Sequence, residues 1–330
     1  MRQVYFLLPG TSGKYACGGL WAELRTLKLA QGICDAAVVT YQQQEADHPF
    51  LSDLLKTADR EQCILVVSWG FHVPQLLRRL KGWHCVYHAH SAGYGFKVPS
   101  NVPILTVSRN TLGYWGQYAP NNLLYYVPNQ IEAEFCNLHL KRDIDVLVQT
   151  RKSSEYLVKQ LVPALQSTCN VEVLDHYVED LAGLYNRTKV YLYDSAEYWA
   201  QEGVTEGFGL QPLEAIACGC YVFSSLNGGL SDYLDPGFNC YKIANHAKAY
   251  DLERIQRVAR LETSQRLPNE FLDEYRATKI QPRLQTILQE VNDFFDKGAN
   301  YQADIPKLTP ARRAQLFSKK VVSKLTKRLG

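Results

Sequence analysis

The sequence predicts an α/β protein with two doubly wound domains, each a parallel sheet covered by helices on both faces. Two observations lead to this prediction. Short apolar runs with strand character alternate with stretches of helical periodicity along most of the 330 residues, which is the pattern of parallel sheets. The chain also exceeds the length that one hydrophobic core usually serves, and the alternation pauses near Pro128 and Asn129 before it resumes.

The first domain is expected to span residues 1–130. Strands are predicted at 4–8, 36–40, 64–68, 85–88, 104–107 and 124–127. The clearest helices are predicted at 20–31 and 75–81. Gly32 and Gly82 follow these helices, where C-terminal caps belong.

The second domain is expected to span residues 131–295. Strands are predicted at 145–149, 171–174, 190–193, 221–224 and 239–243, and helices at 154–166, 181–186, 231–234, 250–261 and 269–295. A further short apolar helix is predicted within residues 206–219, between the strands at 190–193 and 221–224. Pro212 suits its first helical position and Gly219 its C-terminal cap.

Residues 296–330 are expected to form a basic tail. No acidic residue follows Asp304, whereas many lysines and arginines do. Thr309 and Pro310 mark a helix start, after which Ala314, Phe317, Val321 and Leu325 recur at helical spacing. This basic amphipathic helix either packs on the body through its apolar stripe or binds an anionic membrane surface through 307–330. Nucleic acid is not expected as a partner, because no groove rich in aromatic and basic residues accompanies the tail.

The composition indicates a cytoplasmic protein, peripheral on the inner face of the membrane if the tail binds lipid. The apolar run at 4–8 is too short for a signal peptide and is followed at once by Pro9 and Gly10. No segment is long enough to span a bilayer. The nine cysteines include no Cys-x-x-Cys pair, so reduced structural thiols are expected.

The most informative segment is residues 206–214, where two carboxylates, Glu206 and Glu214, bracket a glycine-rich turn. The turn lies between a predicted strand and a predicted helix. Free backbone N–H groups and the positive helix end can then bind an anion, and the glycines let it approach the main chain. The carboxylates suit vicinal hydroxyl groups of sugars. Alternatively, Glu214 only complements the helix dipole and Glu206 is an ordinary turn residue.

Loops at other predicted strand ends carry further candidates, since ligands bind there in open α/β sheets. The loop 9–19 ends in Gly18 and Gly19. It is not a Walker loop, because Lys14 is followed by Tyr15. A glycine pair at a domain cleft fits better, and a flexible surface loop is the alternative.

Two further strand ends carry polar side chains. His88 and His90 lie two residues apart and point the same way, but no clustered carboxylate or third histidine supports a metal site. His90, nearer the loop, can bond a sugar hydroxyl or a phosphate, or be a structural histidine. Arg151 and Lys152 follow another strand and suit a diphosphate, the alternative being an exposed basic loop.

These residues carry a family resemblance. The run from Glu206 to Gly219, with residues 222–225 and the pair at 228–229, resembles the donor-site signature of retaining GT-B glycosyltransferases of the group 1 or family 4 type. Several other positions resemble the same family, and together they extend over residues 1–290: Gly18 and Gly19, His90, Ser108, Pro128 and Asn129.

The resemblance implies a retaining glycosyltransferase that moves a hexose-type sugar from a nucleotide-sugar, UDP- or GDP-linked, to a saccharide or lipid-linked acceptor. It implies two Rossmann-like domains facing across a cleft, with the donor held by the second. No cofactor and no metal are expected, because cations and helix ends neutralise the leaving diphosphate. The alternative is a catalytically silent subunit that binds sugar nucleotides or acts as a scaffold.

The resemblance also implies roles for individual residues. Glu206 and His90 would act at the transferred sugar, and Glu214 would hold the ribose. Two sets of residues would complete the donor site: Gly18, Gly19, Arg151 and Lys152, and the N–H groups of Phe208, Gly209 and Leu210.

This chain departs from the family pattern at four places. Gln130 replaces a glycine, Tyr221 a proline and Asp232 a glutamate. The family also spaces its lysine several residues beyond the arginine, whereas Lys152 is adjacent to it and the next lysine is Lys159.

Overall fold

The computed structural model describes residues 1–243, 247–265, 267–298 and 308–329. The chain divides into two compact units, residues 1–289 and 290–330. Two sheets, both entirely parallel, lie in the first unit, so the predicted α/β class is confirmed. The domain boundaries expected at residues 130 and 295 stay a prediction.

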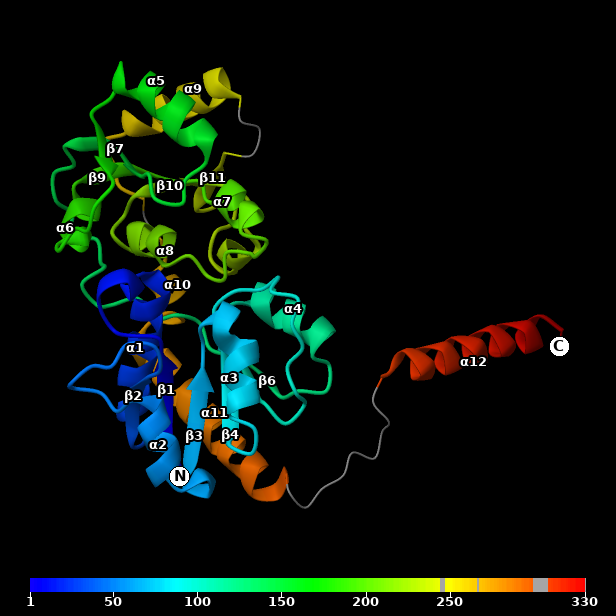
Figure 1. Cartoon of the computed structure of the whole chain (residues 1–330). Coiled ribbons are helices and arrows are strands. Elements are labelled where there is room, and N and C mark those ends of the chain that lie inside the picture. Colours follow the sequence, from blue (N-terminus) through cyan, green and yellow to red (C-terminus); the bar gives the residue numbers. More distant parts are fainter. Residues whose placement is uncertain (244–246, 266, 299–307, 330) are drawn as a thin grey trace. The chain divides into compact units, whose positions relative to one another are not determined.

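The first sheet has six strands in the order β2-β1-β3-β4-β5-β6. They are β1 (Gln3–Leu8), β2 (Ala36–Thr40), β3 (Cys63–Val67), β4 (His84–Ala89), β5 (Ile104–Thr106) and β6 (Leu124–Tyr126). The accompanying helices are α1 (Gly18–Gln31), α2 (Leu51–Thr57), α3 (Val73–Arg79) and α4 (Arg109–Tyr118), which Figure 1 shows around the strands.

One face of the first sheet packs on α2, α3 and α4. Leu54, Leu76 and Trp115 of these helices share a buried cluster with Leu7 and Tyr87 of the strands. Side chains alternate between the two faces of a strand, and α1 contacts β1 and β2 without contributing to that cluster. Because β1, β3 and β4 are parallel neighbours, their carboxyl ends lie at the same edge of the sheet. The loop before α1 and the two histidines are at this edge.

The second sheet has five strands in the order β11-β10-β9-β7-β8. They are β7 (Ile144–Gln149), β8 (Val171–Leu174), β9 (Thr188–Tyr193), β10 (Tyr221–Ser224) and β11 (Cys240–Lys242). The helices that follow β7 in the chain are α5 (Val162–Gln166), α6 (Leu181–Asn186), α7 (Ala196–Gln201), α8 (Leu210–Ala217), α9 (Lys248–Ala259), α10 (Asn269–Asp273), α11 (Ala277–Gly298) and α12 (Pro310–Leu329).

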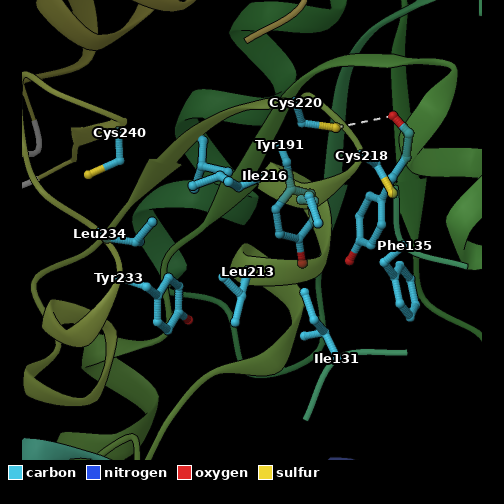
Figure 2. Close-up of a cluster of buried hydrophobic side chains, with 14 of the residues drawn as sticks. Ile131, Phe135, Tyr191, Leu213, Ile216, Cys218, Cys220, Tyr233, Leu234 and Cys240 are labelled. Atoms are coloured by element: carbon cyan, nitrogen blue, oxygen red, sulfur yellow. Dashed lines mark hydrogen bonds between the residues drawn. The ribbon is translucent and has the colours of Figure 1, made fainter. Parts of the chain in front are cut away.

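Helices cover both faces of the second sheet. On one face, α5 and α9 bury Val148, Leu192 and Phe223. On the other face, α6 and α8 bury Leu147 and Tyr191, and Figure 2 shows part of this cluster, with the Cys220 thiol donating to a backbone carbonyl. This alternation explains why the strands read as nearly continuous apolar runs in the sequence.

The predicted helix at 154–166 is irregular in the structure. Residues Leu157–Leu161 form a π-helix, and the α-helix α5 begins only at Val162. Pro163 lies in the first turn of α5. Because proline lacks an N–H group and its ring clashes with the carbonyl four residues earlier, it prevents a continuous α-helix here.

The single helix predicted at 269–295 is two helices, α10 and α11. The interruption coincides with Tyr275, which is 4% exposed and whose carbonyl accepts a hydrogen bond from the Ile131 N–H at 3.0 Å. The Tyr275 carbonyl therefore bonds to the segment that joins the two sheets, and not to an N–H group of the predicted helix. The sequence pattern contains no sign of this distant partner.

Smaller differences concern helix ends. Pro212 is the third residue of α8, not the first, because the helix begins at Leu210. The short helix predicted at 231–234 is a 3₁₀ turn at Gly228–Asp232. By contrast, α6 and the start of α12 at Pro310 lie where they were predicted. None of the helices in the described ranges is both long and apolar enough to cross a membrane.

Candidate functional site

The glycine-rich turn of residues 206–214 leads directly into α8. Gly209 is the N-cap residue and has a φ of 73°, a left-handed conformation that glycine adopts without strain. A Cβ at this position would also lie 2.4 Å from Leu230 Cδ2. The Tyr233 hydroxyl supports the turn by donating to the Phe208 carbonyl at 2.9 Å. Backbone conformation and packing both require glycine at 209.

The backbone N–H groups of Phe208, Gly209 and Leu210 are available to a ligand. Within the described ranges, none of the three donates a hydrogen bond. They stand at the beginning of α8, where no carbonyl one turn earlier exists to accept them. Together with the positive end of the helix dipole they form a position for an anion.

Glu206 precedes this turn and is 9% exposed. Its Oε2 atom accepts hydrogen bonds from Tyr193 Oη and Trp199 Nε1, both at 2.6 Å, and from Ser195 Oγ at 3.3 Å. No described residue donates to Oε1, and Oε1 is not among the buried atoms that lack a partner. The three donors thus fix the carboxylate and leave its second oxygen open to a hydroxyl group.

Glu214 lies inside α8 and is 4% exposed. Its Oε1 atom forms an ion pair with Arg25 of α1, whose Nη1 is 3.1 Å away. Arg25 also donates to the Gln130 carbonyl at 3.3 Å and lies 3.4 Å from Glu132. Burial raises the pKa of the Glu214 carboxyl, and Arg25 opposes this effect. A ligand at Glu214 therefore has to share the carboxylate with Arg25, which the sequence did not indicate.

The two histidines at the end of β4 share a carboxylate from another element. Glu23 of α1 accepts hydrogen bonds at its Oε2 atom from His88 Nδ1 at 2.6 Å and from His90 Nε2 at 2.7 Å. The sequence shows no carboxylate near the histidines, but the fold brings one to both rings. One signal was present: Glu23 lies between Leu20 and Leu27 on the buried face of α1, where an acidic side chain needs a partner.

Glu23, His88 and His90 also offer atoms that can ligate a metal ion, all within 4.8 Å of one another. Carboxylate oxygen and imidazole nitrogen are ligands that zinc accepts. In this structure, however, Glu23 Oε2 already accepts a hydrogen bond from each ring. Hydrogen bonding accounts for Glu23 Oε2 and the two ring nitrogens that face it, whereas Glu23 Oε1 and His88 Nε2 are buried without a partner among the described residues.

The turn of residues 206–214 and the His90 loop are in direct contact. A Cβ built on Gly207 would lie 1.4 Å from the His90 carbonyl oxygen. Next to this contact, the Thr205 N–H donates to the Ala92 carbonyl at 2.9 Å. The structure therefore brings His90 to the motif turn, although the two are separated by more than one hundred residues in the sequence.

Of the two basic residues after β7, Lys152 contacts a side chain that bonds to the motif turn. Lys152 has a φ of 64°, which is uncommon for a residue with a side chain, and its Nζ lies 4.3 Å from the centre of the Trp199 ring. The same indole donates to the motif carboxylate. Arg151 is exposed. Lys159, the alternative lysine, forms an exposed ion pair with Glu155 at 2.8 Å, so Lys152 is the better candidate of the two.

Gly18 and Gly19 form the exposed N-terminal end of α1. Apart from the adjacent residues and the backbone of α1, no protein atom lies within 4 Å of a Cβ built on Gly18, and only the Cys17 sulfur, at 3.8 Å, does so at Gly19. Packing within the chain therefore does not explain the two glycines. No described contact joins them, or Arg151, to the motif turn.

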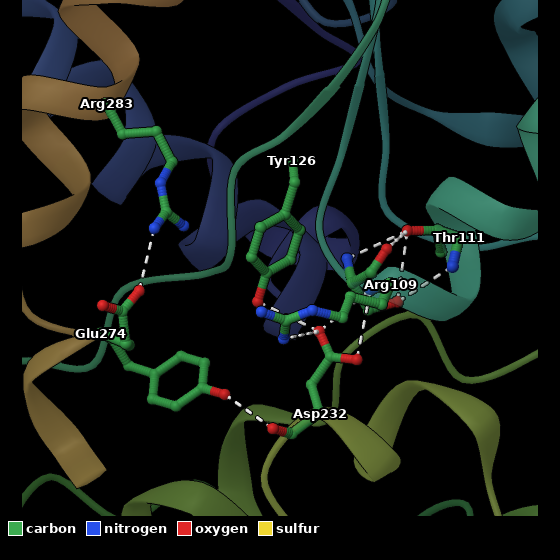
Figure 3. A network of polar contacts seen from close by, with 8 residues as sticks. Arg109, Thr111, Tyr126, Asp232, Glu274 and Arg283 are labelled. Carbon is green, nitrogen blue, oxygen red and sulfur yellow. Dashed lines mark hydrogen bonds and ion pairs between the residues drawn. The ribbon is translucent and has the colours of Figure 1, made fainter.

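Asp232 lies between β10 and β11 of the second sheet and contacts Arg109 at the start of α4, as Figure 3 shows. Its carboxylate accepts hydrogen bonds from the Arg109 backbone N–H at 3.0 and 3.2 Å and from the Tyr126 hydroxyl at 3.1 Å. The Tyr275 hydroxyl donates to the Asp232 carbonyl at 3.0 Å. This carboxylate, one of the departures from the family pattern, is thus used to hold the start of α4.

Comparison with known proteins shows a similarity to one family over the segment that contains the motif turn. Residues 138–274 match the family model described as glycosyl transferases group 1. The match covers less than half of the chain, and over this segment the chain is similar to group 1 glycosyl transferases. The segment contains both motif glutamates, Arg151 and Lys152. None of the curated protein sequences matches the chain significantly.

Solved structures resemble the chain over most of its length. HepE of Anabaena in complex with UDP-glucose has a TM-score of 0.61 at 14% identity, covering 88% of this chain and 100% of that one. Sucrose-phosphate synthase from Thermosynechococcus elongatus has a TM-score of 0.56 at 14% identity, covering 98% and 100%. A glycosyltransferase from Rickettsia africae has a TM-score of 0.56 at 12% identity, covering 91% and 99%. These likenesses confirm the predicted GT-B fold.

Proposed function

We propose that the protein is a retaining glycosyltransferase that moves a hexose-type sugar from a nucleotide-sugar to a saccharide or lipid-linked acceptor, without a metal ion. The observation that carries this proposal is the meeting of three features in one place: the open N–H groups before α8, the fixed carboxylate of Glu206, and the His90 loop. The group 1 family of residues 138–274 supports it, as does the complex of the structurally similar HepE with UDP-glucose.

In this proposal the nucleotide part of the donor lies along the carboxyl edge of the second sheet. Arg151 and Lys152 bind the diphosphate together with the N–H groups at the start of α8. Glu214 accepts hydrogen bonds from the ribose hydroxyls. Gly18 and Gly19 leave room for the donor at the N-terminal end of α1, since nothing in the chain fills that space.

Glu206 and His90 act at the transferred sugar. Glu206 Oε1 accepts a hydrogen bond from a hydroxyl group of the sugar, and His90 orients the sugar. Arg151, Lys152 and the N-terminal end of α8 stabilise the charge that develops on the leaving diphosphate, so the step requires no metal ion. The bond between the anomeric carbon and the diphosphate oxygen breaks through an oxocarbenium-like state. The acceptor oxygen bonds to the same face of that carbon and gives its proton to the departing diphosphate, so the configuration is retained.

We expect Glu206→Ala to lower sugar transfer and donor hydrolysis by about 100-fold or more, the scale of losing one preorganised polar group at a reacting centre. The assay incubates the protein with UDP-, GDP- and ADP-hexoses and measures release of the nucleoside diphosphate. Glu202→Ala is the matched control, because Glu202 is an exposed carboxylate at the end of α7. It should leave turnover unchanged.

The alternative is a catalytically silent subunit that binds sugar nucleotides or acts as a scaffold. Tight donor binding without turnover on any acceptor would favour it. Equal turnover of Glu206→Ala and Glu202→Ala would also contradict the proposed role of Glu206.

We further propose that α12 binds an anionic membrane surface on the cytoplasmic side. Along this helix Phe317, Val321, Val322 and Leu325 are all exposed and fall on one side at helical spacing. Lysines and arginines occupy much of the remaining circumference. An apolar face flanked by basic residues lies in the plane of an anionic lipid interface.

We expect Phe317→Asp to abolish sedimentation with vesicles of anionic phospholipid, because it places a charge in the apolar face. Leu316→Asp is the matched control: Leu316 is also exposed but lies on the other side of the helix. A chain ending at Asp304 should lose vesicle binding and keep donor turnover. Unchanged sedimentation of this shortened chain would contradict the membrane proposal.

A further inference from the structure

Glu23 joins both histidines at the end of β4 through a single oxygen atom, Oε2. The side chains of Glu23 and His88 are each 1% exposed, and that of His90 is 15% exposed. We propose that Glu23 positions His90 and fixes the ring tautomer whose Nδ1 atom accepts a hydrogen bond from a hydroxyl group of the transferred sugar. This inference rests on the proposed glycosyl transfer.

The position of the hydrogen atom on His90 follows from the chemistry of its partner. An ionised carboxylate only accepts hydrogen bonds, so the 2.7 Å contact with Glu23 places the hydrogen on His90 Nε2. Burial by itself raises the pKa of Glu23, but the attraction of His88 and the hydrogen bonds from both rings outweigh it and hold the pKa well below 4.5. Burial lowers the pKa of His90, which favours the neutral ring.

A neutral imidazole with its hydrogen on Nε2 carries a lone pair on Nδ1. No described residue bonds to His90 Nδ1, and this atom is not among the buried atoms that lack a partner. The Nδ1 edge is therefore the open side of the ring. The His90 backbone contacts Gly207 of the motif turn, and an open Nδ1 atom is suited to a hydroxyl donor from a sugar bound at that turn.

His88 supports Glu23 and does not reach a ligand. Its Nδ1 donates to the same oxygen at 2.6 Å, and its Nε2 is buried without a partner. The centres of the two rings are 4.3 Å apart. His88 thus holds the carboxylate while Glu23 holds His90, and both act on the sugar only through His90.

The distances favour hydrogen bonding over a metal centre. Glu23 Oε2 lies 2.6 and 2.7 Å from the two nitrogen atoms, the range of charge-assisted hydrogen bonds. Two ligand atoms about 2.0–2.1 Å from a tetrahedral zinc ion are about 3.3 Å apart. Zinc bound by these three atoms would therefore require the side chains to separate.

The tautomer is measured directly by NMR on the full chain labelled with ¹⁵N in histidine. Long-range proton–nitrogen correlations distinguish a protonated ring nitrogen from a bare one, and the His90→Gln variant assigns the His90 signals. At neutral pH we expect a protonated Nε2 and a bare Nδ1. The opposite tautomer of His90 would overturn the proposal.

Two substitutions of Glu23 separate positioning from charge. Glu23→Gln keeps an oxygen acceptor, so the His90 tautomer and most of the transfer rate should remain. Glu23→Leu removes the acceptor, so we expect mixed tautomers and a fall of about tenfold in kcat/KM for the nucleotide-sugar, equivalent to about one hydrogen bond. Inhibition by the nucleoside diphosphate alone should not change, because it lacks the sugar. Lys28→Gln, at an exposed position of α1, is the control.

Donor analogues that each lack one hydroxyl group test the contact itself. The unchanged protein should discriminate against one of them, and Glu23→Leu and His90→Ala should both lose this discrimination. If Glu23→Leu does not fold, the spectrum of the unchanged protein and the Glu23→Gln variant still decide the tautomer.

Titration with zinc chloride alone provides the remaining test. Stoichiometric tight binding that Glu23→Gln abolishes would make the cluster a metal centre and overturn the proposal, and weak or no binding supports it. A chain that turns over no donor at all would refute the proposed function, while the NMR result would still report on the tautomer.

Discussion

Gly207 is a glycine because of its neighbour and not because of its backbone conformation. Its φ is not among the positive values found for glycines of the described chain, unlike that of Gly209. A Cβ at Gly207 would instead collide with the His90 carbonyl oxygen, 1.4 Å away. Gly207 is therefore required by its contact with His90, whereas Gly209 has a backbone conformation that favours glycine. Only the requirement at Gly209 follows from turn chemistry.

We expect Gly207→Ala to lower the free energy of unfolding by about 1–3 kcal/mol, the usual cost of forcing an extra carbon into a packed site, and to weaken donor binding. Gly113→Ala is the control, because Gly113 is exposed in α4 and the added carbon meets no side chain or other segment within 4 Å. Urea unfolding monitored by circular dichroism measures the difference. Equal unfolding midpoints for both variants would show that the His90 loop moves aside at little cost.

At the scale of elements, α4 begins with one cap from its own sequence and a second from a distant segment. The Ser108 hydroxyl accepts the Thr111 N–H at 3.1 Å, and the Thr111 hydroxyl accepts the Ser108 N–H at 3.0 Å, a reciprocal capping box. Asp232 then accepts the Arg109 N–H. The helix start is thus a place where the segment of the second sheet stabilises an element of the first.

We expect Asp232→Ala to reduce the free energy of unfolding by about 1–2 kcal/mol, because the Arg109 N–H and the Tyr126 hydroxyl both lose an acceptor at a positive helix end. Asp235→Ala is the control, since Asp235 is exposed three residues further along. Chemical unfolding of both variants measures the effect. A loss of stability that is the same in both would mean that the helix cap contributes nothing specific.

At the scale of the whole molecule, the repeated pattern of the chain produced the fold prediction. The apolar runs predicted as strands lie in two parallel sheets, because buried parallel strands carry apolar residues on both faces. Helices proved less regular where proline or a distant hydrogen bond intervened, at α5 and between α10 and α11. Periodicity along one segment contains no information on partners elsewhere.

The sequence by itself determined the α/β class, the two sheets and the motif turn with its glutamates, because each depends on patterns of neighbouring residues. Only the tertiary structure decided that Glu23 bonds to both histidines, that Arg25 forms an ion pair with Glu214, and that the His90 backbone contacts Gly207. These contacts join residues far apart in the chain, and several polar partners satisfy the same local pattern equally well. The packing of α1 and the two sheets decides which polar groups lie beside Glu23 and Glu214. A buried charge is stable only when such a partner is in contact with it.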